Sequence, residues 1–178
     1  IMKSFQHKLM DNNITNDDVK KIIYFLKRNK KRNFTQSLMV KKFEMEWSKW
    51  LGVKYSVFVN SGSSANLLTM TALRILKGEG EVIVPSLTWV SDIASVIQNN
   101  FKPIFVDINK KTLGMDETQV IKNLNKNTKA VFLSHIQGFN GLSENLLKYL
   151  KKKKIELIED VCESHGAKFK NKKLGSYG

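Results

Sequence analysis

Four short polar segments in the 178-residue chain carry the side chains that could do chemistry. They are residues 60–65 (NSGSSA), 85–89 (PSLTW), 134–138 (SHIQG) and 159–166 (EDVCESHG). Each segment follows a short apolar run that predicts a β-strand. In open α/β sheets, ligands bind beyond the carboxyl ends of the strands. We therefore expect the four segments to meet at one site.

The segment 60–65 could bind a phosphate group. It consists of small residues that lead into a predicted helix, whose first backbone N–H groups and dipole favour an anion. Ser63 and Ser64, next to Gly62, would add two hydroxyl groups. The pattern is neither a Walker A motif nor G-x-G-x-x-G, so a nucleoside triphosphate or a dinucleotide is not favoured. The alternative is that Ser63 simply caps the helix, and the segment alone favours neither reading.

The segments also offer a flat aromatic face and a carboxylate for a heterocycle. Trp89 could cover a planar ring, although a lone tryptophan is more often a core residue. Asp160 could pair with a protonated ring nitrogen and keep it cationic, or else cap a helix or join a surface salt bridge. His135 and His165 could be acid/base groups or structural residues, and for His165 we favour the structural role. Phosphate cradle, aromatic cover and carboxylate together suit pyridoxal phosphate.

The formal net charge of +14 raises the possibility of nucleic-acid binding. The densest basic runs, residues 27–32 and 151–154, stand at the predicted C-terminal ends of helices, where the helix dipole favours cations. No aromatic residues alternate with them as stacking platforms. We therefore interpret the lysines as a solvated surface that could attract an anionic substrate, and we expect no nucleic-acid partner.

Other features of the composition indicate a cytoplasmic protein. Residues 1–13 lack the apolar core of a signal peptide, and no apolar run approaches membrane-spanning length, so we expect no membrane partner. The single cysteine, Cys162, excludes an internal disulfide and fits a reducing compartment. No basic cluster surrounds it to lower its pKa, so we interpret it as a small buried packing residue and not as a nucleophile. We assign no residue to a metal.

The elements that must position these segments alternate along the chain. Apolar strands followed by amphipathic helices predict an α/β fold, with a mostly parallel sheet in a three-layer α/β/α arrangement. A helical N-terminal arm (1–52) would precede a partial large domain (53–178). We expect a capping box at Thr15 and Asp18 and a small hairpin around Asn171. Strands are predicted at 55–59, 81–84, 103–106, 129–133 and 155–158, and helices at 16–30, 38–51, 64–76, 88–99, 117–124 and 144–153.

A set of motifs in this order resembles one family. The motifs are Phe34-Thr35-Gln36, Phe43-Glu44, Trp50-Leu51-Gly52-Val53 and the segments 59–67, 82–89, 103–107 and 159–167. They resemble the sugar aminotransferases of the DegT/DnrJ/EryC1/StrS family, which have the type I aspartate-aminotransferase fold. Each motif alone is weak, but together they are specific and cover nearly the whole chain.

The resemblance implies roles for individual residues. Ser63 and Ser64 would bind the cofactor phosphate beside Gly62, and Trp89 would stack on the pyridine ring. Asp160 would pair with the ring nitrogen. Two further residues complete the expected site. Glu163 falls where many relatives carry a glutamine near the ring hydroxyl, and His135 is a possible substrate-side residue.

The resemblance also implies an activity and its cofactor, pyridoxal or pyridoxamine 5'-phosphate. We expect transamination of a nucleotide-linked keto-sugar in polysaccharide, lipopolysaccharide or deoxyamino-sugar biosynthesis. An amino acid such as glutamate would be the donor, and the enzyme would be a homodimer. The family's Schiff-base lysine would lie beyond Gly178, so we expect the chain to be an N-terminal fragment that is inactive alone.

Two alternatives remain open at this stage. The related 3-dehydratases share the pattern of residues 60–67, use pyridoxamine phosphate and have histidine in place of the lysine. The chain could also be a non-catalytic domain that binds a cofactor or a sugar nucleotide.

Overall fold

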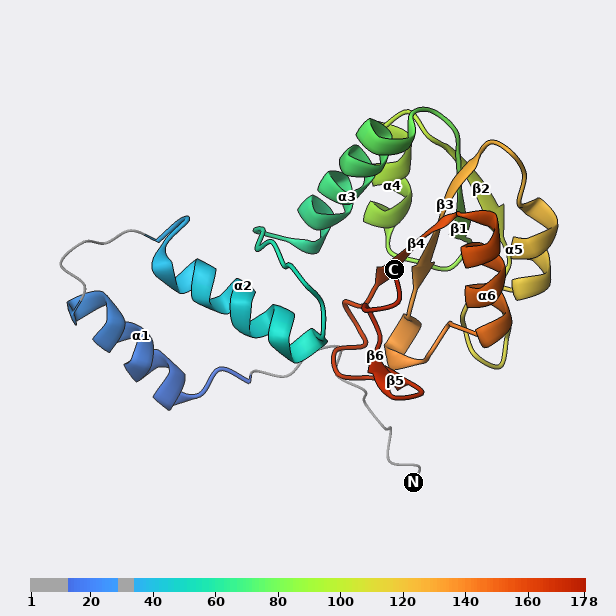
Figure 1. Ribbon diagram of the computed structural model, residues 1–178. Helices are drawn as coiled ribbons and strands as arrows, with labels where there is room; N and C mark the ends of the chain where they lie inside the picture. Colours follow the sequence, from blue (N-terminus) through green and yellow to red (C-terminus); the bar gives the residue numbers. More distant parts are fainter. Residues whose placement is uncertain (1–12, 29–33) are drawn as a thin grey trace, which may run out of the picture. The chain divides into compact units, whose positions relative to one another are not determined.

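The computed structural model describes residues 13–28 and 34–178 (Figure 1). The chain forms two compact units, residues 1–41 and 42–178. Helix α1 (Asn16–Arg28) lies in the first unit, and α2 (Leu38–Leu51) crosses the boundary between the units. The predicted division after residue 52 stays a prediction. The polar stretch 1–12 and residues 29–32 of the first basic run lie outside the described residues.

Helix α1 begins with the predicted capping box. The backbone N–H of Thr15 donates to Asp18 Oδ2 at 2.9 Å, and the backbone N–H of Asp18 donates to Thr15 Oγ1 at 3.2 Å. These reciprocal bonds satisfy N–H groups that have no partner within the helix. In the described part of the chain, no helix is long and apolar enough to cross a membrane.

The second unit is built on a four-stranded sheet with the order β2-β1-β3-β4. All three strand pairings are parallel. The strands are β1 (Glu81–Pro85), β2 (Lys102–Val106), β3 (Thr128–Ser134) and β4 (Glu156–Asp160). The predicted parallel sheet is thus confirmed, and the carboxyl ends of its strands lie along one edge.

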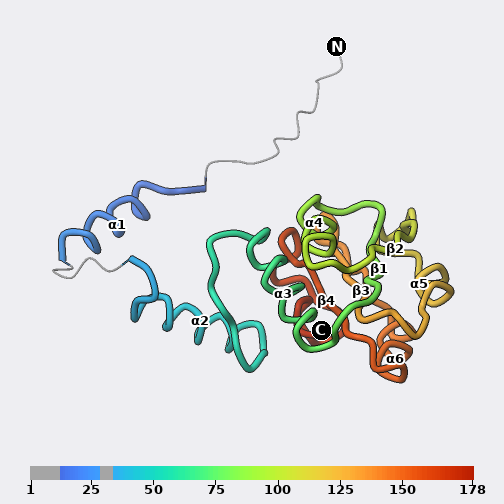
Figure 2. The backbone as a smooth tube through the Cα atoms, turned by 90° about the horizontal axis from the view of Figure 1, so that it is seen from above, coloured from blue at the N-terminus to red at the C-terminus, as the bar shows by residue number. Residues whose placement is uncertain are grey.

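Helices cover both faces of this sheet, as Figures 1 and 2 show. Helices α3 and α4 lie on one face, and α5 and α6 lie on the other. The three-layer α/β/α fold is therefore confirmed. The bounds of these helices are α3 (Gly62–Lys77), α4 (Val90–Gln98), α5 (Glu117–Asn123) and α6 (Glu144–Lys153).

The apolar strands bury side chains on both faces, which explains why they lack a polar alternation. Val82 and Phe132 belong to a core that includes Met70 of α3 and Val96 of α4. Ile83 belongs to the opposite core. That second core also contains Val131, Leu133, Val120 of α5, and Leu146 and Leu150 of α6.

The remaining elements are short. A 3-10 turn, η1 (Ile136–Gly138), follows β3. Beyond β4 the chain forms the predicted hairpin from β5 (Lys168–Phe169) and β6 (Lys172–Lys173). Helix α6 ends in Lys151, Lys152 and Lys153, so the second basic run stands at a helix C-terminus as expected.

One predicted element is wrong. Residues 55–59 form no strand, and Tyr55, Val57 and Phe58 are exposed. A strand requires a neighbouring backbone to pair with, and among the described residues the sheet ends at β4. The backbone N–H of Phe58 instead donates to Glu44 Oε1 at 2.8 Å. The segment therefore has the side chains of a strand without the partner.

Candidate functional site

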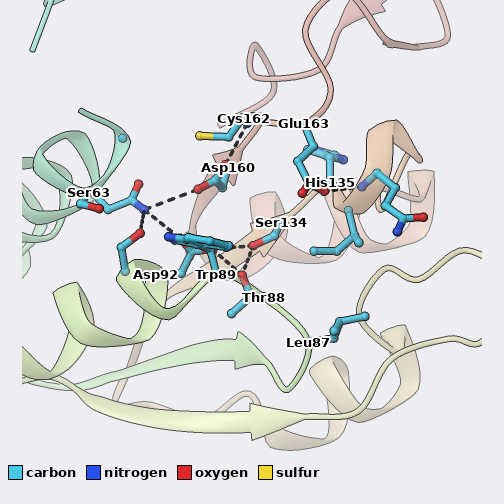
Figure 3. A pocket seen from close by; sticks show the side chains of 15 residues that line it. Ser63, Leu87, Thr88, Trp89, Asp92, Ser134, His135, Asp160, Cys162 and Glu163 are labelled. Atoms are coloured by element: carbon cyan, nitrogen blue, oxygen red, sulfur yellow. Dashed lines mark hydrogen bonds between the residues drawn. The ribbon is translucent and has the colours of Figure 1, made fainter. Parts of the chain in front are cut away.

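A cavity of about 450 Å³ lies at the carboxyl edge of the sheet (Figure 3). Its size is typical of a small-molecule site. Of the residues expected to bind the cofactor or the substrate, all except Ser64 line it, namely Gly62, Ser63, Trp89, His135, Asp160 and Glu163. Further lining residues, to which the sequence assigned no individual role, form a hydrogen-bond network around the site, among them Asn66, Asp92 and Ser134.

Helix α3 presents its N-terminus to the cavity. Its cap is Ser61, whose Oγ accepts a hydrogen bond from the backbone N–H of Ser64 at 3.2 Å. The alternative that Ser63 caps the helix is therefore wrong. Ser63 is exposed to the cavity, and its hydroxyl makes no hydrogen bond with any described residue. The Ser64 hydroxyl is already engaged by that of Ser61, at 3.1 Å.

Gly62 permits a close approach between α3 and the turn after β4. A Cβ atom at this position would lie 3.3 Å from Cys162 Sγ, which is tighter than an ordinary contact. The absence of a side chain therefore lets the first turn of α3 lie directly against the residues that follow Asp160. In the described chain, segment 60–65 reaches the site through this helix terminus and not through the end of a strand.

Asp160 is the last residue of β4 and lies at the centre of the site. The backbone N–H of Cys162 donates to its Oδ1 at 2.9 Å, and Asn66 Nδ2 lies 3.4 Å from its Oδ2. Burial alone would raise the pKa of Asp160, but its hydrogen bonds with Cys162 and Asn66 outweigh it and lower this pKa. Asp160 is therefore an anion at neutral pH.

Asp92 is a second carboxyl group behind Asp160, in the first turn of α4, and is only 1% exposed. Its Oδ1 accepts a hydrogen bond from Asn66 Nδ2 at 2.7 Å, and its Oδ2 accepts one from Ser134 Oγ at 2.6 Å. Burial raises the pKa of Asp92 to about 6, although the hydroxyls of Ser134 and Thr88 oppose the shift.

Trp89 immediately precedes α4 and is 71% exposed. Its alternative reading as a core tryptophan is therefore wrong. The backbone of Trp89 is extended, and its carbonyl oxygen accepts the N–H of Asp92 at 3.0 Å. This local geometry fixes the start of the helix and leaves the indole on the wall of the cavity (Figure 3).

His135 lines the cavity, but both of its ring nitrogens are engaged within the protein. The backbone N–H of Gly141 donates to Nδ1 at 3.1 Å, so the ring proton is on Nε2. Nε2 lies 3.1 Å from Oε2 of Glu159 and donates to it. His165 lies outside the cavity lining, with its ring edge-on to Trp47 at 5.6 Å. That contact agrees with a structural role for His165.

Two residues of the turn after β4 complete the wall. Glu163 accepts a hydrogen bond from the backbone N–H of Gln137 at 2.6 Å, which joins this turn to η1. Cys162 is exposed, so its interpretation as a buried packing residue is wrong. Partial burial of the thiol, together with its hydrogen bond to Asp160, raises the pKa of Cys162 to about 12. The thiol is consequently no nucleophile at neutral pH.

The cavity is acidic. Asp92, Asp160 and Glu163 line it, and no lysine or arginine of the described ranges does. Within residues 13–28 and 34–178, no group of three or more His, Cys, Asp or Glu side chains could hold a metal ion. An anionic ligand group would therefore have to meet the N–H groups of α3 and the Ser63 hydroxyl.

Known proteins share this sequence and fold. Residues 13–178 match the model of the DegT/DnrJ/EryC1/StrS aminotransferase family. The chain is 36% identical to a GDP-4-keto-6-deoxy-D-mannose 3-dehydratase of Yersinia pseudotuberculosis, over 82% of this chain and 38% of that protein. It is 34% identical to a GDP-perosamine synthase of Vibrio cholerae, over 78% of this chain and 38% of that protein. The chain thus spans about two fifths of the length of these relatives.

A solved structure confirms the fold. The Escherichia coli GDP-4-keto-6-deoxy-D-mannose-3-dehydratase with bound hydrated PLP superimposes with a TM-score of 0.86 and 32% identity. The match covers 97% of this chain and 45% of that one. With a family match over nearly all of its residues, the chain belongs to the DegT/DnrJ/EryC1/StrS aminotransferase family.

Proposed function

We propose that the complete protein is a pyridoxal-phosphate-dependent aminotransferase that acts on a nucleotide-linked keto-sugar. The observation that carries this proposal is the meeting of three groups in one cavity. They are the unengaged hydroxyl of Ser63, the exposed indole of Trp89 and the ionised carboxylate of Asp160. Their chemical types match the phosphate, the ring and the ring nitrogen of the cofactor.

The residues present fit this cofactor. At the N-terminus of α3, the first backbone N–H groups have no partner within the helix and favour a phosphate. Ser63 adds a hydroxyl donor there, whereas Ser64 would contribute mainly by holding the Ser61 cap. The face of Trp89 would cover the ring. Glu163 would lie near the ring hydroxyl. The hydrogen bond that Glu163 accepts from the Gln137 N–H would hold its carboxylate in place.

The chemistry follows from the charge on Asp160. When bound, pyridoxal phosphate supplies an electron-accepting ring, and that capacity depends on a protonated ring nitrogen. Asp160 would hold the proton on this nitrogen, because its own pKa is lowered and it stays anionic. His135 would position the neighbouring wall and would not transfer protons, because both its nitrogens are engaged.

A second candidate is a nucleotide-sugar 3-dehydratase of the same family, with pyridoxamine phosphate as cofactor. The observation that favours it is the 36% identity to the 3-dehydratase of Yersinia pseudotuberculosis, and the E. coli 3-dehydratase structure has the same fold. By resemblance, a lysine after Gly178 would favour transamination and a histidine would favour dehydration. Both candidates would use the same cofactor-binding residues, Ser63, Trp89 and Asp160.

The substrates and partners belong to this proposal. We propose a nucleotide-linked keto-sugar and an amino-acid donor as substrates, a cytoplasmic location, and a homodimer, since closed two-fold assemblies are the commonest. The proposed division into an arm (1–52) and a cofactor-binding part (53–178) would leave every cavity-lining residue in the second part.

An isotope experiment distinguishes the two candidates. The full-length protein is incubated with a GDP-linked 4-keto-6-deoxy sugar and ¹⁵N-glutamate, and the sugar product is identified by mass spectrometry and NMR. An aminotransferase yields a ¹⁵N-labelled amino sugar. A 3-dehydratase yields an unlabelled sugar that has lost its 3-hydroxyl group. If the protein binds no pyridoxal or pyridoxamine phosphate at all, both candidates are wrong.

A further inference from the structure

Asp92 is a buried carboxyl group to which the proposed function gives no part. It makes no ion pair with any described residue, and only 1% of its surface is exposed. The charged or titratable groups that face it are Asp160 at the end of β4 and the Cys162 thiol beyond it. Its other neighbours are neutral, namely Asn66 of α3, Thr88 before α4 and Ser134 at the end of β3.

Counting hydrogens around Oδ2 of Asp92 indicates that this group is protonated. Oδ2 lies within hydrogen-bond distance of Thr88 Oγ1, and it lies 2.6 Å from Ser134 Oγ. The two hydroxyl oxygens are themselves 2.5 Å apart. Three hydrogen-bond contacts among these three oxygens require three hydrogens, whereas two hydroxyl groups supply two. A proton on Asp92 supplies the third.

The surroundings of Asp92 agree with this count. No cationic side chain of residues 13–28 and 34–178 offsets the cost of burying its charge, and the nearby charge of Asp160 adds to that cost. Burial is the main reason that the pKa of Asp92 rises to about 6, whereas that of Asp160 is lowered. Below about pH 6 the two adjacent carboxyl groups therefore divide their roles, Asp92 holding a proton and Asp160 a charge.

Asn66 connects the two carboxyl groups, Asp92 and Asp160. Its Nδ2 donates to Asp92 Oδ1 at 2.7 Å and lies 3.4 Å from Asp160 Oδ2. If the amide were turned over, its carbonyl oxygen would face both carboxyl groups. Asp92 therefore determines that Asn66 presents its N–H donors, and not its oxygen, to Asp160.

We propose that Asp92 is a positioning residue of the cofactor site. It keeps a proton in the hydroxyl ring of Thr88 and Ser134 and, through Asn66, orients Asp160 as the ionised partner of the ring nitrogen. This inference rests on the proposed function only for the role of Asp160. The proton on Asp92 follows from contacts within the chain.

The proton is tested directly by ¹³C NMR of the full-length protein labelled at the aspartate carboxyl carbons. We expect one aspartate to titrate near pH 6, about two units above the ordinary value of about 3.9. This titration should vanish in Asp92→Asn. It should persist in the matched control Asp107→Asn, because Asp107 is exposed after β2 and lies outside the cavity lining. A titration near pH 6 that persists in Asp92→Asn overturns the assignment.

The positioning role is tested by the affinity for pyridoxamine phosphate below pH 6, where Asp92 holds its proton. Affinity is measured by calorimetry on variants whose folding is verified by circular dichroism. Asp92→Asn mimics the protonated acid, because its amide donates to the two hydroxyls and accepts from Asn66. We expect it to retain affinity within about threefold. Asp92→Ala removes these bonds and should weaken binding about tenfold or more, as loss of an orienting hydrogen bond does elsewhere.

The two arms have separate outcomes. Equal binding by wild type and Asp92→Ala overturns the positioning role, and so does an equal loss in Asp92→Asn and Asp92→Ala. A wild-type protein that binds no pyridoxamine phosphate overturns the proposed function, and the positioning role with it. The NMR titration then still decides whether Asp92 holds the proton.

Discussion

His135 and Glu159 form a buried pair beside the candidate site, with 3.1 Å between Nε2 and Oε2 and with side chains 0% and 2% exposed. Glu159 also accepts the backbone N–H groups of Gly175, Tyr177 and Gly178. Burial would raise the pKa of Glu159, but these bonds and the one from His135 outweigh it and lower this pKa. The pair thus fixes the last described residues against β4.

Replacement of Glu159 by glutamine should destabilise the protein. Each carboxylate oxygen of Glu159 accepts N–H donors, whereas a glutamine has an NH2 group in place of one oxygen. That NH2 group cannot accept a hydrogen bond, so the buried donors facing it lose their partner. We expect the free energy of unfolding of the full-length protein to fall by about 1–3 kcal/mol, measured by urea denaturation. Glu156→Gln on the same strand is the control, since its bridge to Lys77 is solvent-exposed and should cost under about 1 kcal/mol. Equal effects of the two substitutions would contradict this account.

Asp92 should make the stability of the protein depend on pH in the opposite direction to an ordinary aspartate. The pKa of Asp92 is raised in the folded state. Between pH 3.8 and about pH 6, the folded state therefore keeps a proton that the unfolded state has already released. Wild type therefore loses stability as the pH rises through this window, by up to about 3 kcal/mol relative to Asp92→Asn. Denaturation curves at several pH values measure the difference, and a constant difference would refute the prediction.

Trp89 should contribute affinity through its ring face. We expect Trp89→Ala to weaken binding of pyridoxamine phosphate about tenfold, because stacking and burial of the indole are lost. Trp89→Phe retains a smaller face and should lie between Ala and wild type. Fluorescence or calorimetric titration of the full-length protein gives the three dissociation constants. If phenylalanine binds no better than alanine, stacking is not the role of Trp89.

Cys162 should react slowly with alkylating reagents although it is exposed. Its pKa of about 12 leaves almost no thiolate at neutral pH, and the hydrogen bond to Asp160 is one cause. Iodoacetamide should therefore modify it at least about tenfold more slowly than a free thiol with a pKa of about 8.5. Asp160→Asn should accelerate the reaction, whereas Asp107→Asn should not. Modification is followed by mass spectrometry of the intact protein.

The sheet and most of the site could be predicted from the sequence because they depend on local patterns. Apolar runs such as 129–133 form buried parallel strands, and the parallel arrangement alone brings Trp89 and Asp160 to one edge. Residues 55–59 have the same kind of composition but form no strand. Pairing depends on a partner that composition does not reveal.

The hydrogen-bond network behind the site could not be predicted. Asp92 lies in no motif, and although Asn66 and Ser134 lie in named segments, the role of all three comes from tertiary contacts between α3, α4 and β3. A retrospective signal exists for Asn66, which is one helical turn after Gly62 and so lies on the same face of α3. Likewise, the choice between Ser61 and Ser63 as the cap depended on where the helix begins, which patterns locate poorly.

Asp160→Ala in the full-length protein tests whether Asp160 is the partner of the ring nitrogen. Turnover of the nucleotide-linked keto-sugar and binding of pyridoxamine phosphate are measured together, with Asp107→Ala, just beyond the end of β2, as the control. We predict that Asp160→Ala loses turnover by at least about a hundredfold and weakens cofactor binding, while the control resembles wild type. Unchanged turnover with the cofactor still bound would contradict the assignment of Asp160 as the ring-nitrogen partner.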